Sequence, residues 1–277
     1  MVRNCAVLGA PITHSLSPVL HTAAYAHLGL DAWHYGRYDV DESQLGPFLD
    51  GLDSTWRGLS LTMPLKQAAL TCVDEVSELA RVVTAANTIV LDDDGRRFAD
   101  NTDVPGMTNA LAERGADAAS AAAILGGGAT ARSAVAAVRD RSDSVTVYLR
   151  TATQAVALHD VADAVGVRLG VRPWEERRDA LAAPLLISTT PAGVADDLAH
   201  DVPTRPGVLL DVVYAPWPTA LATTWGDAGG TVVAGMDFLA HQARLQVSLF
   251  TGYDVPVGVL RDAGVSAIES RAGSPTG

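Results

Sequence analysis

The clearest chemical signal in this chain comes from Lys66, the only lysine among its 20 basic Lys and Arg residues. Arginine stays protonated over the accessible pH range, whereas a partly buried lysine shifts its pKa readily and can act as an acid or a base. Codon bias alone could also leave a single lysine. The position of Lys66 favours proton transfer, because an apolar strand over 56–61 is followed by a loop at Met63-Pro64 and a helix beginning near Lys66. Open α/β sheets bind their ligands at such strand ends.

Two serines follow the first apolar strand, Cys5–Leu8, at the start of a helical pattern that ends at Gly29. Ser17 precedes Pro18 and has the chemistry of a helix N-cap. Ser15 is not needed for that cap. Two hydroxyl groups beside the free N–H groups of a helix N-terminus would also bind an anion or a carboxylate.

A predicted hairpin brings further polar groups together. Two extended runs, 87–91 and 96–99, are joined by an acidic turn that ends in Asp94-Gly95, a strong hairpin signal, and we expect no metal there. Counting back from the turn places Asn87 opposite Asn101 within a residue or two, so Asn87 and Asp103 emerge at the same end of the ribbon. Asp103 is then either a functional carboxylate or the cap of the following helix.

A dinucleotide site is indicated by a buried strand over 121–125, a glycine turn and an alanine-rich helix to Val138. The turn reads Gly126-Gly127-Gly128-Ala129-Thr130, in which glycines permit close backbone approach to a pyrophosphate at the helix N-terminus. The next strand, 145–149, ends at Arg150 and Thr151 where an NAD site usually has Asp or Glu. Arginine suits a 2′-phosphate, so NADP is favoured over NAD.

The remaining pattern continues the alternation of strands and helices, including a helix over 175–181 and a long apolar helix after Gly235 in which Gln242 is a polar exception. The tail 270–277 is expected to be disordered. An α/β fold follows, and 277 residues suffice for two domains.

Composition excludes several classes of function. The formal charge of −12 argues against nucleic-acid and anionic-membrane partners, which require a basic surface. The two cysteines form neither a disulfide framework nor a metal cluster. There is no secretory signal and no apolar run near the roughly 20 residues that span a bilayer, so a cytoplasmic location is expected.

Taken together, these motifs resemble the shikimate dehydrogenase family over nearly the whole chain. The matching elements, in order, are Ser15-Leu16-Ser17-Pro18, Thr62-x-Pro64-x-Lys66, Ala86-Asn87-Thr88, Asn101-Thr102-Asp103-x-x-Gly106, the turn from Gly126, Asp211-x-x-Tyr214-x-Pro216, and Gly235-Met236 with Gln242.

The resemblance implies an NADP(H)-dependent reduction of 3-dehydroshikimate to shikimate, a step toward chorismate and the aromatic amino acids, in which Lys66 and Asp103 form the catalytic pair. It implies that the substrate is held by Ser15, Ser17, Thr62, Asn87, Asp103, Tyr214 and Gln242. It implies that the dinucleotide is held by Gly126, Gly127, Gly128, Ala129, Thr130, Arg150, Thr151 and Gly235. It also implies an α/β substrate-binding domain over 1–103 plus 235–277 and a Rossmann-type NADP-binding domain over 104–234.

Three positions depart from the family pattern: Ser60 stands where Asn is common, Leu149 stands where Asn precedes the arginine, and Gln154 replaces a second basic residue. Serine still preserves a hydroxyl at position 60, but a clamp reduced to Arg150 weakens the preference for NADP. The alternatives are a quinate or aminoshikimate dehydrogenase that prefers NAD, and a dinucleotide-binding regulatory module without turnover. The sequence leaves open whether the chain forms a homodimer.

Overall fold

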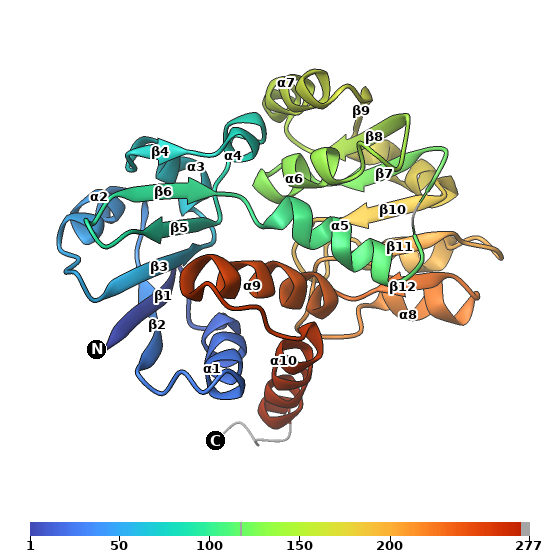
Figure 1. Cartoon of the computed structure of the whole chain (residues 1–277). Coiled ribbons are helices and arrows are strands. Elements are labelled where there is room, and N and C mark those ends of the chain that lie inside the picture. The colour runs from blue at the N-terminus through green and yellow to red at the C-terminus, as the bar shows by residue number, and fades with distance from the viewer. Residues whose placement is uncertain (117, 273–277) are drawn as a thin grey trace. The chain divides into compact units, whose positions relative to one another are not determined.

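The computed structural model describes residues 1–116 and 118–272. The chain forms two compact units, which we name unit 1 (Met1–Gly106 with Ala240–Gly277) and unit 2 (Met107–Leu239). The borders between them fall inside helices α5 (Asp103–Glu113) and α9 (Gly235–Thr251). Each unit is built on a sheet of its own, which confirms the predicted α/β class (Figure 1).

The sheet of unit 1 is mixed, with the strand order β2-β1-β3-β5-β6-β4. Its strands are β1 (Arg3–Gly9), β2 (Trp33–Asp39), β3 (Trp56–Leu61), β4 (Glu75–Val76), β5 (Thr88–Leu91) and β6 (Arg97–Asp100). Strand β1 runs parallel to β2 and β3, whereas β5 runs antiparallel to β3 and β6. The carboxyl ends of β1, β3 and β6 therefore share one edge with the start of β5.

The hairpin of β5 and β6 has the register expected from its turn. Thr88 pairs with Asp100, so Asn87 lies across from Asn101 as predicted. In the turn, the Asp92 carboxylate accepts hydrogen bonds from the backbone N–H groups of Asp94 and Arg96. The Asp92 side chain thus stabilises the acidic turn. The pairing of β5 with β6 places Asn87 and Asn101 at the shared edge.

The helices of unit 1 cover this sheet and bury an aliphatic core around Leu8, Leu59 and Ile89. They are α1 (Ser17–His27), α2 (Glu42–Asp50), α3 (Leu65–Ala68), α4 (Glu78–Val82), the 3-10 turn η1 (Ala69–Thr71), the later part of α9, and α10 (Val257–Ala272). The tail predicted to be disordered is helical as far as Ala272, and its residues 273–277 lie outside the described residues.

The sheet of unit 2 is entirely parallel, with the order β9-β8-β7-β10-β11-β12. Its strands are β7 (Ala122–Leu125), β8 (Ser144–Leu149), β9 (Arg168–Pro173), β10 (Leu185–Ser188), β11 (Val208–Asp211) and β12 (Thr231–Val233). Numbered within the unit, this is the order 3-2-1-4-5-6 of dinucleotide-binding sheets, which bind ligands where the order reverses. In unit 2 that point lies between β7 and β10.

The helices of unit 2 are α6 (Ala129–Ala137), α7 (Ala155–Val165), α8 (Ala220–Asp227), and the 3-10 segments η2 (Ala152–Gln154), η3 (Trp174–Ala182) and η4 (Asp196–Asp201). The α-helix predicted over 175–181 is wrong, because η3 is a 3-10 segment. Only Ala180 and Leu181 of η3 are buried, so it has no continuous apolar face that would favour an α-helix. Within the described residues, no helix is both long and apolar enough to cross a membrane.

Candidate active site

The two predicted catalytic groups meet at the shared edge of the unit 1 sheet. Lys66 lies in α3 just after β3, and Asp103 is the first residue of α5 after β6. Lys66 Nζ lies 2.6 Å from Asp103 Oδ2, and their side chains are 16% and 5% exposed. A lysine in this setting keeps a carboxylate partner while its ammonium group remains within reach of a ligand.

The carboxylate of Asp103 has a second partner and is not needed as a helix cap. Asn87 Nδ2 donates to Asp103 Oδ1 at 2.8 Å. The first turn of α5 is instead capped by Asn101, whose Oδ1 accepts from the N–H of Val104 at 3.1 Å. Of the two roles open to Asp103 in the sequence, the geometry therefore favours the functional carboxylate.

Gln242 reaches this cluster from α9. Its Oε1 lies 3.2 Å from Asn87 Nδ2, and its side chain is buried. A Cβ added to Gly106 would lie 2.7 Å from the Cβ of Gln242. The glycine in the Asn101–Gly106 motif thus allows α5 and α9 to approach closely enough to bring Gln242 to Asn87.

The serine loop differs from its prediction in one respect. Leu16 occupies the N-cap position of α1 with no side-chain cap, so the N-cap role predicted for Ser17 is wrong. Ser17 N instead donates to Ser15 Oγ at 3.3 Å, which draws the two serines together. Pro18 has no backbone N–H, so the first turn of α1 has one donor fewer that needs a capping acceptor.

Two arginines donate hydrogen bonds to backbone carbonyl groups of the same loop. Arg37 Nη1 donates to the carbonyl of Thr13, and Arg271 Nη1 donates to that of His14 at 3.2 Å. Both guanidinium groups therefore lie beside the segment that leads into Ser15, in a chain whose net charge is strongly negative. Thr62 is half-buried in the turn from β3 to α3, where its carbonyl accepts from the N–H of Leu65 at 2.8 Å.

Sequence patterns missed a second layer of buried polar side chains, formed by Ser60, Thr88, Gln246, Tyr35 and His21. The one available signal was the spacing of Gln246, four residues after Gln242 and thus on the same helix face. The hydroxyl that serine preserves at position 60 is buried and donates to Gln246 Oε1 at 2.7 Å.

His21 makes the stability of unit 1 depend on pH. Burial lowers the pKa of His21 from 6.5 to about 3, so the folded state keeps it neutral while the unfolded chain takes up a proton below pH 6.5. The contribution of neutral His21 to the free energy of unfolding is therefore complete above pH 6.5. It is lost as the pH falls toward 3, at up to about 1.4 kcal/mol per pH unit.

We expect His21→Phe to flatten the acid side of the stability curve, since phenylalanine retains a ring against Tyr35, whose ring centroid lies 4.0 Å away. Urea unfolding midpoints measured between pH 7 and pH 4 check this, and groups common to both proteins cancel in the comparison. Parallel curves for the wild type and the variant would contradict the assignment.

The glycine turn of unit 2 fits a dinucleotide pyrophosphate. Gly126 has a φ of +108°, and a Cβ there would lie 2.6 Å from Thr189 Oγ1 in the loop after β10. Gly128 is the N-cap of α6 and, as a glycine, has no side chain with which to cap that end. The start of α6 therefore lies at the reversal point between β7 and β10, the place at which sheets of this strand order bind an anionic group.

The other predicted cofactor residues also lie in unit 2. Arg150 and Thr151 are exposed at the carboxyl end of β8, the strand next to β7. A Cβ on Gly127 would lie 2.5 Å from Gln154 Oε1, so Gln154 packs against the glycine turn. Gly235 is buried where a Cβ would come within 2.4 Å of the Val212 carbonyl oxygen, and Tyr214 is half-buried two residues further along that loop.

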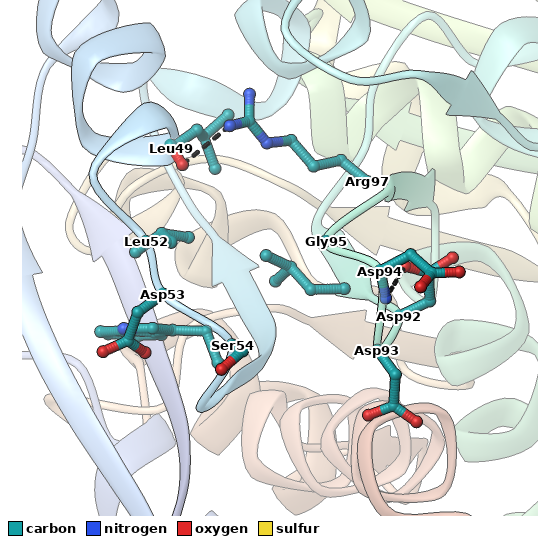
Figure 2. Close-up of a pocket in the computed structure, with 11 residues that line it drawn as sticks. Leu49, Leu52, Asp53, Ser54, Asp92, Asp93, Asp94, Gly95 and Arg97 are labelled. Atoms are coloured by element: carbon teal, nitrogen blue, oxygen red, sulfur yellow. Dashed lines mark hydrogen bonds between the residues drawn. The ribbon is translucent and has the colours of Figure 1, made fainter.

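A surface pocket of about 240 Å³ lies at the opposite end of the β5–β6 hairpin from Asn87. Figure 2 shows the Arg97 side chain extending across it to the carbonyl of Leu49 and the acidic turn at Asp92 on its rim. These polar groups have partners within the chain, and the pocket contains none of the predicted site residues. Among the described residues, no group of three or more His, Cys, Asp or Glu side chains could hold a metal ion.

Comparison with known proteins identifies relatives of this architecture. Residues 7–89 match the family model described as the shikimate dehydrogenase substrate binding domain. The NADP(+) shikimate dehydrogenase of Thermus thermophilus is 37% identical over 251 residues, which cover 89% of this chain and 92% of that protein.

Comparison with solved structures also finds shikimate dehydrogenases. The shikimate dehydrogenase of Mycobacterium tuberculosis is 40% identical with a TM-score of 0.86, over 95% of this chain and 99% of that one. A shikimate 5-dehydrogenase of Thermus thermophilus, solved with NADP(H) and shikimate, is 34% identical with a TM-score of 0.83, over 96% of this chain and all of that one.

Proposed function

The chain belongs to the shikimate dehydrogenase family, and on that premise we propose that it is an NADP-dependent oxidoreductase that interconverts 3-dehydroshikimate and shikimate, with Lys66 and Asp103 as its catalytic pair. The observation that carries the catalytic part is the 2.6 Å contact between Lys66 Nζ and Asp103 Oδ2. The catalytic reaction belongs to the biosynthesis of aromatic amino acids. We propose unit 1 as the substrate-binding domain and unit 2 as the NADP-binding domain, close to the sequence borders of 1–103 plus 235–277 and 104–234.

Lys66 is the proposed proton donor of this reaction. Bound NADPH supplies a hydride to the substrate carbonyl, whose oxygen then gains negative charge. An ammonium group placed beside that oxygen supplies both positive charge and a proton. Asp103 holds the ammonium group through one oxygen, while its other oxygen stays fixed by Asn87. The pair is thus oriented before the substrate arrives.

Substrate recognition needs hydroxyl partners and a carboxylate site. We propose that Ser15 and Ser17 bind the substrate carboxylate, supported by their hydrogen-bonded pairing at the start of α1. Arg37 and Arg271, next to this loop, offset the negative field of the whole chain. The ring hydroxyls are proposed to be held by Thr62, Asn87, Asp103, Tyr214 and Gln242.

Cofactor recognition is proposed for residues of unit 2 only. The turn from Gly126 to Thr130 would hold the pyrophosphate, and Gly235 keeps its loop free of a side chain. Arg150, with Thr151, would hold the 2′-phosphate that distinguishes NADP from NAD. The exposed position of Arg150 supports this role, because a phosphate at the edge of the sheet needs an accessible partner.

The function is tested by initial rates of the purified chain with shikimate and with quinate, each against NADP+ and NAD+. We expect the highest kcat/KM for shikimate with NADP+. Turnover of quinate with NAD+ instead would replace the proposed substrate and cofactor, and cofactor binding without turnover of either substrate would identify a regulatory module.

Removal of the Arg150 charge is expected to change the choice of cofactor. Arg150→Gln should raise the KM for NADP+ about tenfold, the equivalent of about 1.4 kcal/mol, and leave the KM for NAD+ unchanged. Arg205→Gln, which removes an equal charge from an exposed position before β11, serves as the control. An equal rise for both cofactors in Arg150→Gln would show that Arg150 does not read the 2′-phosphate.

We further propose a cytoplasmic location, which the two free cysteines, Cys5 and Cys72, support. Sedimentation velocity of the purified chain tests whether it forms the homodimer that the sequence leaves open.

A further inference from the structure

The amide of Gln246 is saturated with hydrogen bonds although it lies almost fully buried inside unit 1. Its Oε1 accepts from Ser60 Oγ at 2.7 Å and lies 3.3 Å from His21 Nε2. Its Nε2 donates to the backbone carbonyl of Asn87 at 3.1 Å and to Thr88 Oγ1 at 3.0 Å. A flipped amide would bring its oxygen against the Asn87 carbonyl, so the orientation of Gln246 is unique.

The Gln246 amide donates to the Thr88 hydroxyl, which is left with its own proton to donate. That proton goes to Asn87 Oδ1, which at 2.9 Å is a closer acceptor than Thr102 Oγ1 at 3.4 Å. The same oxygen of Asn87 accepts from the backbone N–H of Thr102 at 2.7 Å. With its oxygen held on this side, Asn87 presents Nδ2 to the Asp103 carboxylate.

The network continues on the other side of Gln246 to strand β2. Ser60 Oγ accepts from the hydroxyl of Tyr35 at 2.5 Å and itself donates to Gln246 Oε1. Every hydrogen bond along this chain, from Tyr35 to Asp103, is therefore donated in the same direction.

The intermediate members of this network are neutral. Burial raises the pKa of Tyr35 and lowers the pKa of His21 to about 3, so neither group ionises near neutral pH. The polar chain consequently brings aligned dipoles, and no further charge, to the Lys66–Asp103 pair. Aligned hydrogen bonds polarise one another, which strengthens the last bond of the series.

We propose that Thr88 and Gln246 are positioning residues of the reaction, which hold the Asn87 amide in the one orientation that donates to the Asp103 carboxylate. This role rests on the proposed function. Neither side chain is placed to touch the substrate, since both are almost fully buried and their hydrogen-bonding atoms are used within the chain. They act by keeping Asp103, and through it Lys66, in a single geometry.

The test replaces the Thr88 hydroxyl by a methyl group and keeps the β-branched shape of the side chain. Thr88→Val is expected to lower kcat for shikimate oxidation about tenfold and to leave the KM for NADP+ unchanged. Thr88→Ser, which restores the hydroxyl, should return kcat to within about threefold of the wild type. Thr251→Val is the matched control. Thr251 Oγ1 donates to the Val247 carbonyl and accepts from the N–H of Tyr253 at the carboxyl end of α9, and neither bond involves the side chain of Gln246 or Thr88. The kcat of this variant should stay at the wild-type value.

Measuring Thr88→Val again in an Asn87→Ala background distinguishes a positioning role through Asn87 from a merely structural role of Thr88. If Thr88 acts through Asn87, Thr88→Val adds less than about twofold there, because residues that act as a unit are not additive. A wild-type kcat in Thr88→Val, or a further tenfold loss in the Asn87→Ala background, would overturn the proposal. If Thr88→Val does not fold, Gln246→Met is measured in the same two backgrounds with the same expectations.

One readout is independent of turnover. In protein labelled with ¹⁵N-asparagine, the Asn87 side-chain amide should be protected from hydrogen exchange in the wild type and lose protection in Thr88→Val. Unchanged protection would contradict the positioning role even if the chain turned over another substrate, whereas failure of the wild type to oxidise shikimate would refute the proposed function alone.

Discussion

Replacement of Lys66 by alanine is expected to lower kcat for shikimate oxidation at least about a hundredfold, with a modest change in KM. The size of the effect is that of a lost general acid or base. Lys66 Nζ is held 2.6 Å from Asp103, at the end of β3, and the chain has no second lysine to substitute for it. Steady-state kinetics at saturating NADP+ measure the change.

Lys66→Arg distinguishes the proton from the charge. The guanidinium group would still pair with Asp103 but would not release its proton at accessible pH. We expect Lys66→Arg to remain at least about tenfold below the wild type, while the Kd for NADP+ is unchanged in both variants because Lys66 lies in unit 1. Near-normal kcat in Lys66→Ala would remove Lys66 from the mechanism, and full activity in Lys66→Arg would reduce its role to electrostatics.

Gly126→Ala is expected to weaken NADP+ binding at least about tenfold. A side chain is strained at a φ of +108°, and its Cβ would lie 2.6 Å from Thr189 Oγ1. Thr189 Oγ1 donates to the carbonyl of Leu125 at 2.7 Å, so it cannot move without breaking a contact between β7 and the loop after β10. The turn must open instead, which moves the N–H groups that are proposed to face the pyrophosphate. Isothermal titration with NADP+ measures the loss.

The control for this variant is Gly166→Ala. Gly166 also has a positive φ, +75°, at the carboxyl end of α7, but a Cβ there would meet no atom within 4 Å. It should lower the melting temperature slightly through backbone strain alone and bind NADP+ as the wild type does. Equal losses of affinity in Gly126→Ala and Gly166→Ala would show that the glycine turn has no special role.

Local patterns predicted the parts of the site that lie at strand ends. An apolar run fixes the end of β3, and a recognisable Asp-Gly turn sets the pairing of Thr88 with Asp100. The turn places Asn87 and Asp103 at one end of the ribbon, because strand direction determines which ends share an edge. The arrival of Lys66 at the same edge also needs the antiparallel pairing of β3 with β5, which only the family resemblance implied. The glycine turn after β7 was recognisable for the same reason, since its spacing is local.

Long-range polar contacts were not predictable in this way. Gln246 lies within the apolar periodicity of α9, and its sequence neighbours do not indicate that its amide pairs with Thr88. The partners of the Ser60 hydroxyl, Tyr35 and Gln246, come from distant elements, so no local pattern indicates them. The N-cap role of Ser17 was wrong because a hydroxyl before proline is compatible with a cap but does not require one.

The hydrogen bond between Gln246 and Thr88 joins positions 158 residues apart, and unit 2 occupies one uninterrupted stretch of chain between them. During synthesis from the N-terminus, β5 and the whole of unit 2 leave the ribosome before Gln246 does. Unit 2 can then fold as soon as it emerges, whereas unit 1 must wait for the end of the chain. The amide of Gln246 is therefore among the last groups of the site to be synthesised, and unit 2 is complete before the Lys66–Asp103 pair has all of its supporting side chains.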